Sequence, residues 1–251
     1  MKYYFYIEEA VKGGLEKAYD YSIPLLVSAL KVKQLRLENK LIKQKMLNQL
    51  SVERSQQQGI SGYISWLYGR INYSNKLAGI KPDMDMLYFS LVKDYLNQKS
   101  DSEDSYDVWA RGYFCLDKPY YDTQKDSLIA TIPKMSSTND KLWSQTLLLS
   151  AASEHNDVEF YQKVKNEICS LAEEENVNQA LKKIPLEDFQ GWALSLLLAS
   201  EVKLFSKNKL TENILGDLSE VIKKDKNPHD IAMIDAYLFN LKEEYNFKSN
   251  L

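Results

Sequence analysis

The chain has 251 residues, of which 44% are hydrophobic and 27% charged, which is the balance of a soluble globular protein. The formal net charge of −3 argues against nucleic acid as a partner. Two cysteines and two histidines show no zinc-site spacing, so we expect neither a metal nor a cofactor.

The first residues, MKYYFYIEEA, form an apolar run that Glu8 and Glu9 interrupt, which is unlike a signal peptide. The longest apolar stretches, such as 194–199, are far too short to span a membrane. We therefore expect a cytoplasmic protein with no membrane partner.

Helical periodicity begins early in the chain. Residues 24–55 predict one long, basic-tending helix with Pro24 near its start, which could pack on the domain or form a dimer. We expect a single all-helical domain over 1–251, with 1–57 as a candidate N-terminal helical extension. Pro82 breaks the chain before a helix over 84–97, and the polar stretch 98–105 predicts a loop.

The next segment, 106-YDVWARGYFCLDKPYYDTQKDSLIATIP-133, reads as a helical hairpin. The pattern predicts helices over 107–116 and 120–132, with the turn at 117–119. A loop over 133–139 follows, and Asp140 is a candidate cap for the next helix.

Three Trp-led apolar segments recur at 109-WARGYFCL, 143-WSQTLLLSAAS and 192-WALSLLLAS, and each precedes a second amphipathic stretch. The second stretches lie near 120–131, 157–172 and 209–223. Their uneven spacing excludes a regular tetratricopeptide array. The sequence therefore predicts an all-α fold, an irregular stack of helical hairpins with about ten helices.

Arg111 is the one cationic side chain on a largely apolar helix. A partly buried arginine usually needs a carboxylate, and Asp107 lies one turn before it. We expect an Asp107–Arg111 ion pair, with ligand binding by Arg111 as the alternative.

The segments 107-DVWARGYFCLDKPYYDTQKDSLIATIP-133 and 140-DKLWSQTLLLSAASEHNDVEFYQKV-164 resemble the middle region of all-helical immunity proteins from bacterial polymorphic-toxin systems. Those proteins place a Trp-containing helix before a short turn and a second helix that ends in an apolar residue and Pro. The resemblance covers about residues 60–205. It implies inhibition of a cognate toxin by direct binding, without catalysis.

Charge and tyrosine content favour the same function. Residues 61–251 carry 22 Lys and Arg against 29 Asp and Glu, whereas residues 1–60 carry 10 against 6. An acidic body attracts a basic partner, and tyrosines supply rigid contact area at interfaces. The expected partner-binding residues are Tyr106, Asp107, Tyr120, Tyr121, Asp122 and Asp126, with Asp101, Glu103 and Asp104 as an acidic rim.

Two alternatives remain open at this stage. Asp83, Asp85 or Asp107 could supply the paired carboxylates of a carbohydrate-active enzyme with a helical toroid-like fold. A helical-repeat adaptor or effector-like scaffold, which binds a peptide in a groove, is the other.

Overall fold

The computed structural model describes residues 86–225 without a gap and, outside that range, residues 61–63, 65, 66, 68, 69, 234, 237, 238, 241, 245 and 247. The predicted extension at 1–57, the long helix at 24–55, and the residues Asp83 and Asp85 lie outside the described residues.

The described part of the chain is a packed helical bundle. Between residues 86 and 225 it contains eight α-helices, one 3-10 helix and no strand, which confirms the all-α prediction for this part. The helices are α6 (Met86–Gln98), α7 (Ser105–Phe114), α8 (Lys118–Thr131), η2 (Ile132–Lys134), α9 (Thr138–Glu154), α10 (Val158–Ala172), α11 (Val177–Leu181), α12 (Gln190–Phe205) and α13 (Lys209–Lys224).

Local capping chemistry explains the helix boundaries in the predicted hairpin. Asp104 accepts hydrogen bonds from two backbone amides at the start of α7, and Asp117 accepts one at the start of α8. The expected cap at Asp140 is wrong. Ser137 caps α9 instead and accepts the backbone N–H of Asp140, because the helix begins three residues earlier than the charge pattern suggested.

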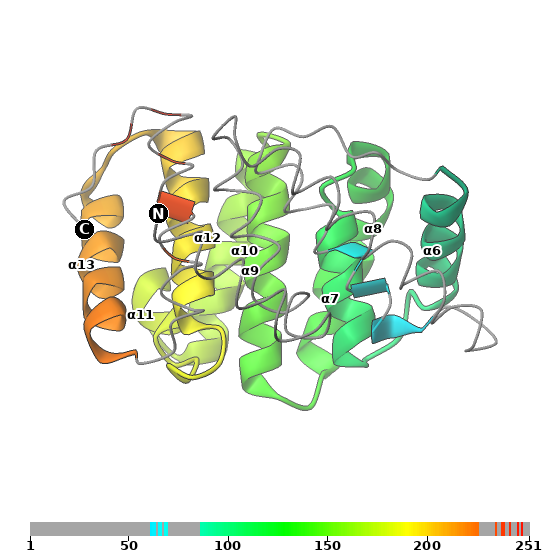
Figure 1. The fold of residues 1–251 in the computed structure, drawn as a ribbon, viewed down its shortest axis with the longest axis horizontal. Coiled ribbons are helices and arrows are strands. Elements are labelled where there is room, and N and C mark those ends of the chain that lie inside the picture. The colour runs from blue at the N-terminus through cyan, green and yellow to red at the C-terminus, as the bar shows by residue number, and fades with distance from the viewer. Residues whose placement is uncertain are drawn as a thin grey trace, which may run out of the picture.

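Helix α9 occupies the centre of the bundle, where it contacts α7, α8, α10 and α12 (Figure 1). Every residue from 142 to 153 is buried, since this helix is apolar on all sides rather than along one stripe. Several of its hydroxyl groups donate to the helix's own backbone, as when Thr146 donates to the carbonyl of Leu142 at 2.8 Å. Gly112 lets α7 approach α9 closely, because a Cβ at that position would lie 3.0 Å from the Cβ of Leu147 in α9.

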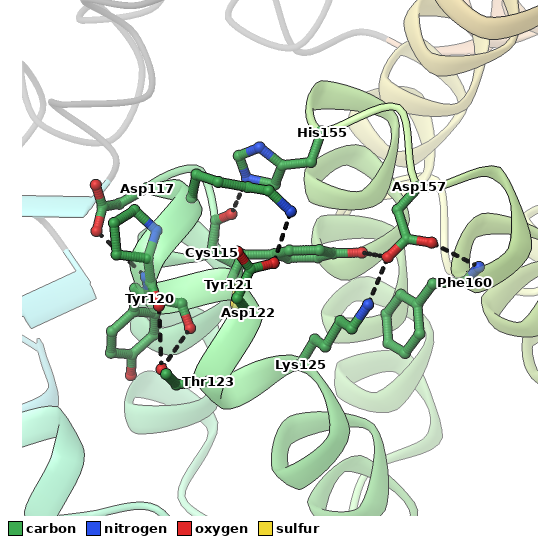
Figure 2. Close-up of polar contacts among 12 residues, drawn as sticks. Cys115, Asp117, Tyr120, Tyr121, Asp122, Thr123, Lys125, His155, Asp157 and Phe160 are labelled. Atoms are coloured by element: carbon green, nitrogen blue, oxygen red, sulfur yellow. Dashed lines mark hydrogen bonds and ion pairs between the residues drawn. The ribbon is translucent and has the colours of Figure 1, made fainter.

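Three carboxylates tie successive helices together by the same arrangement. On α8, Tyr121 and Lys125 lie one turn apart and both contact Asp157, the N-cap of α10. The close-up in Figure 2 shows this first carboxylate between its two partners. Its Oδ1 also accepts the backbone N–H of Phe160 at 3.1 Å.

The second and third carboxylates lie further along the chain. Tyr161 and Lys165 of α10 donate to the same oxygen of Glu201 on α12, each at 2.7 Å. In the third case, Asn178 and Lys182 donate to the two oxygens of Asp217 on α13, at 2.7 and 2.8 Å. We call these three groups, centred on Asp157, Glu201 and Asp217, the carboxylate clamps.

The Glu201 clamp should contribute more to stability than any exposed ion pair. The side chain of Glu201 is 3% exposed, so Glu201→Gln leaves the charge of Lys165 unpaired in a partly buried place. We expect a loss of about 3 kcal/mol in the free energy of unfolding, measured by urea titration. Lys224→Gln, which breaks an exposed pair with Glu220, is the matched control and should change it by less than about 0.5 kcal/mol. Equal effects of the two substitutions would contradict this account.

The Asp157 clamp should make stability depend on pH. Partial burial raises the pKa of Asp157, but hydrogen bonds from Lys125, the Phe160 amide and Tyr121 outweigh it and hold the pKa below its ordinary value of 3.8. Because the folded-state pKa is depressed, the ionised carboxylate stabilises the fold above that value, and this stabilisation is lost as the pH falls. The stability difference between wild type and Asp157→Asn should therefore shrink from pH 7 to pH 3 in urea unfolding. A constant difference would show that Asp157 contributes nothing through its charge.

Candidate functional site

An exposed acidic turn leads into α7. Asp101, Glu103 and Asp104 are all exposed in the connection from α6, which is the loop that the sequence predicted. The next large side chain, Tyr106, is 39% exposed and stands in the first turn of α7. We call Asp101, Glu103, Asp104 and Tyr106 the acidic edge.

Tyr106 is held rigidly by other aromatic rings. Its ring centroid lies 5.4 Å from Tyr63, 5.5 Å from Trp66 and 5.4 Å from Trp109, with the rings of Tyr63 and Trp109 close to perpendicular to it. Such edge-to-face packing fixes a side chain without burying it completely. A partner that contacts Tyr106 would therefore meet a preorganised ring, which reduces the entropy cost of binding.

The aromatic contacts continue into the centre of the protein. Phe189 packs edge-on against Trp109 at 5.5 Å and stacks on Trp143 at 5.0 Å, and Trp192 follows at 5.9 Å from Phe189. The three tryptophans that marked helix starts in the sequence therefore meet around one phenylalanine. Sequence reasoning did not single out Phe189, which precedes α12 without any apolar periodicity.

Two further carboxylates, Asp140 and Asp188, lie near Ser105 at the start of α7. Ser105 at the start of α7 donates to Asp140 at 2.6 Å, and Asn139 donates to Asp188 at 3.4 Å. The starts of α7 and α9 and the connection before α12 thus lie together. Sequence reasoning did not assign Asp140 and Asp188 to a surface, because only the tertiary fold brings these positions next to residue 105.

Two other predicted residues, Asp122 and Asp126, lie exposed on α8. Asp122 accepts a hydrogen bond from Lys118 at 2.6 Å, so part of its charge is neutralised. The C-terminal half of α8 adjoins the acidic turn, because Ser127 and Thr131 each donate to the carbonyl of Ser100 at 3.5 Å. Asp126 therefore lies closer than Asp122, along α8, to the residues that contact this turn.

The remaining predicted residues, Asp107, Tyr120 and Tyr121, are buried. Tyr120 and Tyr121 are fully enclosed, and Asp107 is 4% exposed. Burial and the hydrogen bond to Asp157 raise the pKa of Tyr121, so its hydroxyl stays protonated. The side chains of these three residues pack inside the fold and do not form part of its exposed surface.

The expected Asp107–Arg111 ion pair is wrong. Asp107 accepts hydrogen bonds from Tyr95 at 2.8 Å and from Ser102 at 2.7 Å. Arg111 is fully buried and donates from Nη2 to Ser127 at 3.2 Å, while its Nε and Nη1 have no hydrogen-bond partner among the described residues. Asp107 and Arg111 lie one helical turn apart in sequence, but the carboxylate of Asp107 accepts its hydrogen bonds from Tyr95 and Ser102 instead.

A buried cation without a carboxylate partner should destabilise the fold. We expect Arg111→Met, which keeps the volume and removes the charge, to raise the free energy of unfolding by about 1–4 kcal/mol. Arg111→Lys retains the charge and loses the planar donor geometry that reaches Ser127, so it should not stabilise. Urea unfolding measures both variants. A large loss of stability in Arg111→Met would show that the guanidinium is fully compensated.

The carboxylates proposed for an enzyme are not brought together by the described residues. Asp107 is held by Tyr95 and Ser102, and the other two lie outside the described range. Among the described residues, no group of three or more His, Cys, Asp or Glu side chains is placed to hold a metal ion. None of the helices described combines the length and the apolarity that crossing a membrane requires.

Comparison with protein-family models, with curated proteins and with solved structures found no match for this chain. The arrangement of its own side chains is therefore the basis for a functional proposal.

Proposed function

We propose that this protein is a non-catalytic protein-binding module, an immunity protein that neutralises a basic bacterial toxin domain by direct binding. The observation that carries the proposal is the acidic edge, where a rigid, half-exposed Tyr106 adjoins three exposed carboxylates. Aromatic side chains with a polar tip are frequent anchors of protein interfaces. Surrounding carboxylates would speed the encounter with a basic partner by long-range attraction.

The internal distribution of charge supports the same function. The clamp carboxylates Asp157, Glu201 and Asp217 are each paired with lysine, so they add little to the external field. The carboxylates of the acidic turn have no lysine partner among the described residues, and their field reaches solvent. Salt screens that field with a decay length of roughly 8 Å at physiological ionic strength, so the attraction for a basic partner should weaken as the salt concentration rises.

The finer architecture belongs to this proposal as well. Helices α7 and α8, α9 and α10, and α12 and α13 are in contact as consecutive pairs, and α9 contacts both α7 and α12. These contacts support an irregular stack of helical hairpins, and the acidic edge lies where the first of these hairpins begins.

The test is co-expression of the full chain with each neighbouring gene product, followed by capture through a tag on this chain. A neighbour that is toxic alone should co-purify with it and lose its toxicity. Failure of every neighbour to bind a stable, monomeric chain would overturn the immunity role.

Variants then locate the surface. Tyr106→Ala and the double variant Asp101→Lys/Glu103→Lys should each weaken the complex at least tenfold, because the first removes the anchor and the second reverses the attraction. Glu159→Lys/Glu167→Lys, at exposed positions of α10, makes the same change in net charge elsewhere. Equal weakening by this control pair would show that only overall charge matters, and unchanged affinity in the edge variants would exclude the acidic edge.

A further inference from the structure

A second surface feature lies at the opposite end of the bundle from α6. A groove of about 940 Å³ opens between α10, α11 and α13, in the region where Figure 1 shows these helices together. Its lining is rich in side-chain amides, contributed by Asn166, Asn176, Asn178, Gln179 and Asn213. None of its lining residues belongs to the acidic edge.

Gly216 exposes bare helix backbone in this groove. It lies within α13, where glycine is less favourable than alanine. A Cβ added at Gly216 would have no atom within 4 Å, so no packing contact in the described structure requires glycine here. The missing side chain leaves room for an external group to approach the helix backbone closely.

Asn178 lines the same groove and has an unused acceptor. Its side chain is 3% exposed, and Nδ2 donates to Asp217 at 2.7 Å. Its Oδ1 has no hydrogen-bond donor among the described residues. A buried acceptor without a donor is unfavourable, and a ligand N–H group that reached it would satisfy it.

The charges of the groove favour a cationic ligand. Within the described residues, Glu175 has no ion pair, and Glu212 and Glu220 pair with lysines only at 3.5 Å or more. Of the two lysines in the lining, Lys165 is already neutralised by Glu201. The carboxylates therefore outnumber the available cations.

We infer that this groove binds an extended peptide segment that carries lysine or arginine. Each side-chain amide offers one acceptor oxygen and two donor hydrogens, which match the C=O and N–H groups of a peptide backbone. The amides bind the backbone, the glutamates attract the basic side chains, and Gly216 lets the peptide lie against α13. An acidic peptide or a small apolar ligand would leave these groups unmatched.

The experiment measures binding of fluorescein-labelled hexapeptides to the full chain by fluorescence anisotropy. The probes are (Lys-Ser)₃, (Glu-Ser)₃ and a (Lys-Ser)₃ peptide that is N-methylated at alternate residues. The basic peptide should bind at least tenfold more tightly than either of the others, because the second has the wrong charge and the third lacks backbone donors. Equal binding of the basic and N-methylated peptides would overturn backbone recognition, and equal binding of the acidic peptide would overturn the charge preference.

Two perturbations test the location. Gly216→Leu should fill the groove and weaken (Lys-Ser)₃ binding at least tenfold, while Ala130→Leu, at an exposed position of α8, should leave it unchanged. The chain also has a native handle, because Cys115 is buried and Cys169 lines the groove and is half-buried. A bulky maleimide adduct on Cys169 should block binding as Gly216→Leu does, which keeps the test decisive if that variant is less stable. Binding that survives both changes would exclude this groove. That outcome would not bear on the proposed role of the acidic edge, because the assay contains no toxin.

Discussion

The fold depends on three paired carboxylates at helix interfaces, of which Glu201 and Asp217 are buried and Asp157 is partly buried. Asp157, Glu201 and Asp217 each receive one neutral hydrogen bond and one lysine from residues four apart on a preceding helix. A pair at i and i+4 lies on one helix face, so the two donors converge on a single carboxylate across the interface. Burying a charge in this way is tolerable only because both partners are supplied. The clamps also select one register between helices, since sliding a helix by one turn would separate the donors from the acceptor.

The same constraint explains how the protein remains acidic outside. Lysines of α8, α10 and α11 are directed into the clamps, where they neutralise internal carboxylates. The acidic turn before α7 keeps its charge exposed, beside a tyrosine that other rings hold in place. The clamps and the proposed binding surface therefore use different carboxylates. Arg111 is the exception inside, because it is enclosed without a carboxylate partner among the described residues.

Local patterns in the sequence predicted the helices well where capping and turn residues were explicit. Asp117 and Pro119 marked the turn between α7 and α8, and the structure begins α8 there. The acidic turn was also predictable, since a run of Ser, Asp and Glu between two apolar segments has no core to join. The turn at Asp117 and Pro119 and the acidic run before α7 are thus the local patterns from which the exposed residues of the proposed surface were predicted.

What the sequence could not show depends on contacts between distant residues. The spacing of Asp107 and Arg111 suited an ion pair, yet Tyr95 and Ser102 bind the aspartate from outside the helix. Tyr120 and Tyr121 look like surface residues beside charged neighbours, but they lie on the faces of α8 that pack against other elements. The amide-lined groove unites three helices that are dispersed over more than fifty residues, so no local motif indicated it.

The most direct test of the proposed binding surface is hydrogen exchange of the full chain, free and bound to a toxin identified by co-expression, read by mass spectrometry. The account predicts slower exchange on binding for backbone amides of 101–107 and 138–141, at the acidic edge and the adjoining start of α9. Slower exchange confined to α13, with 101–107 unchanged, would contradict the assignment of the acidic edge as the toxin-binding surface.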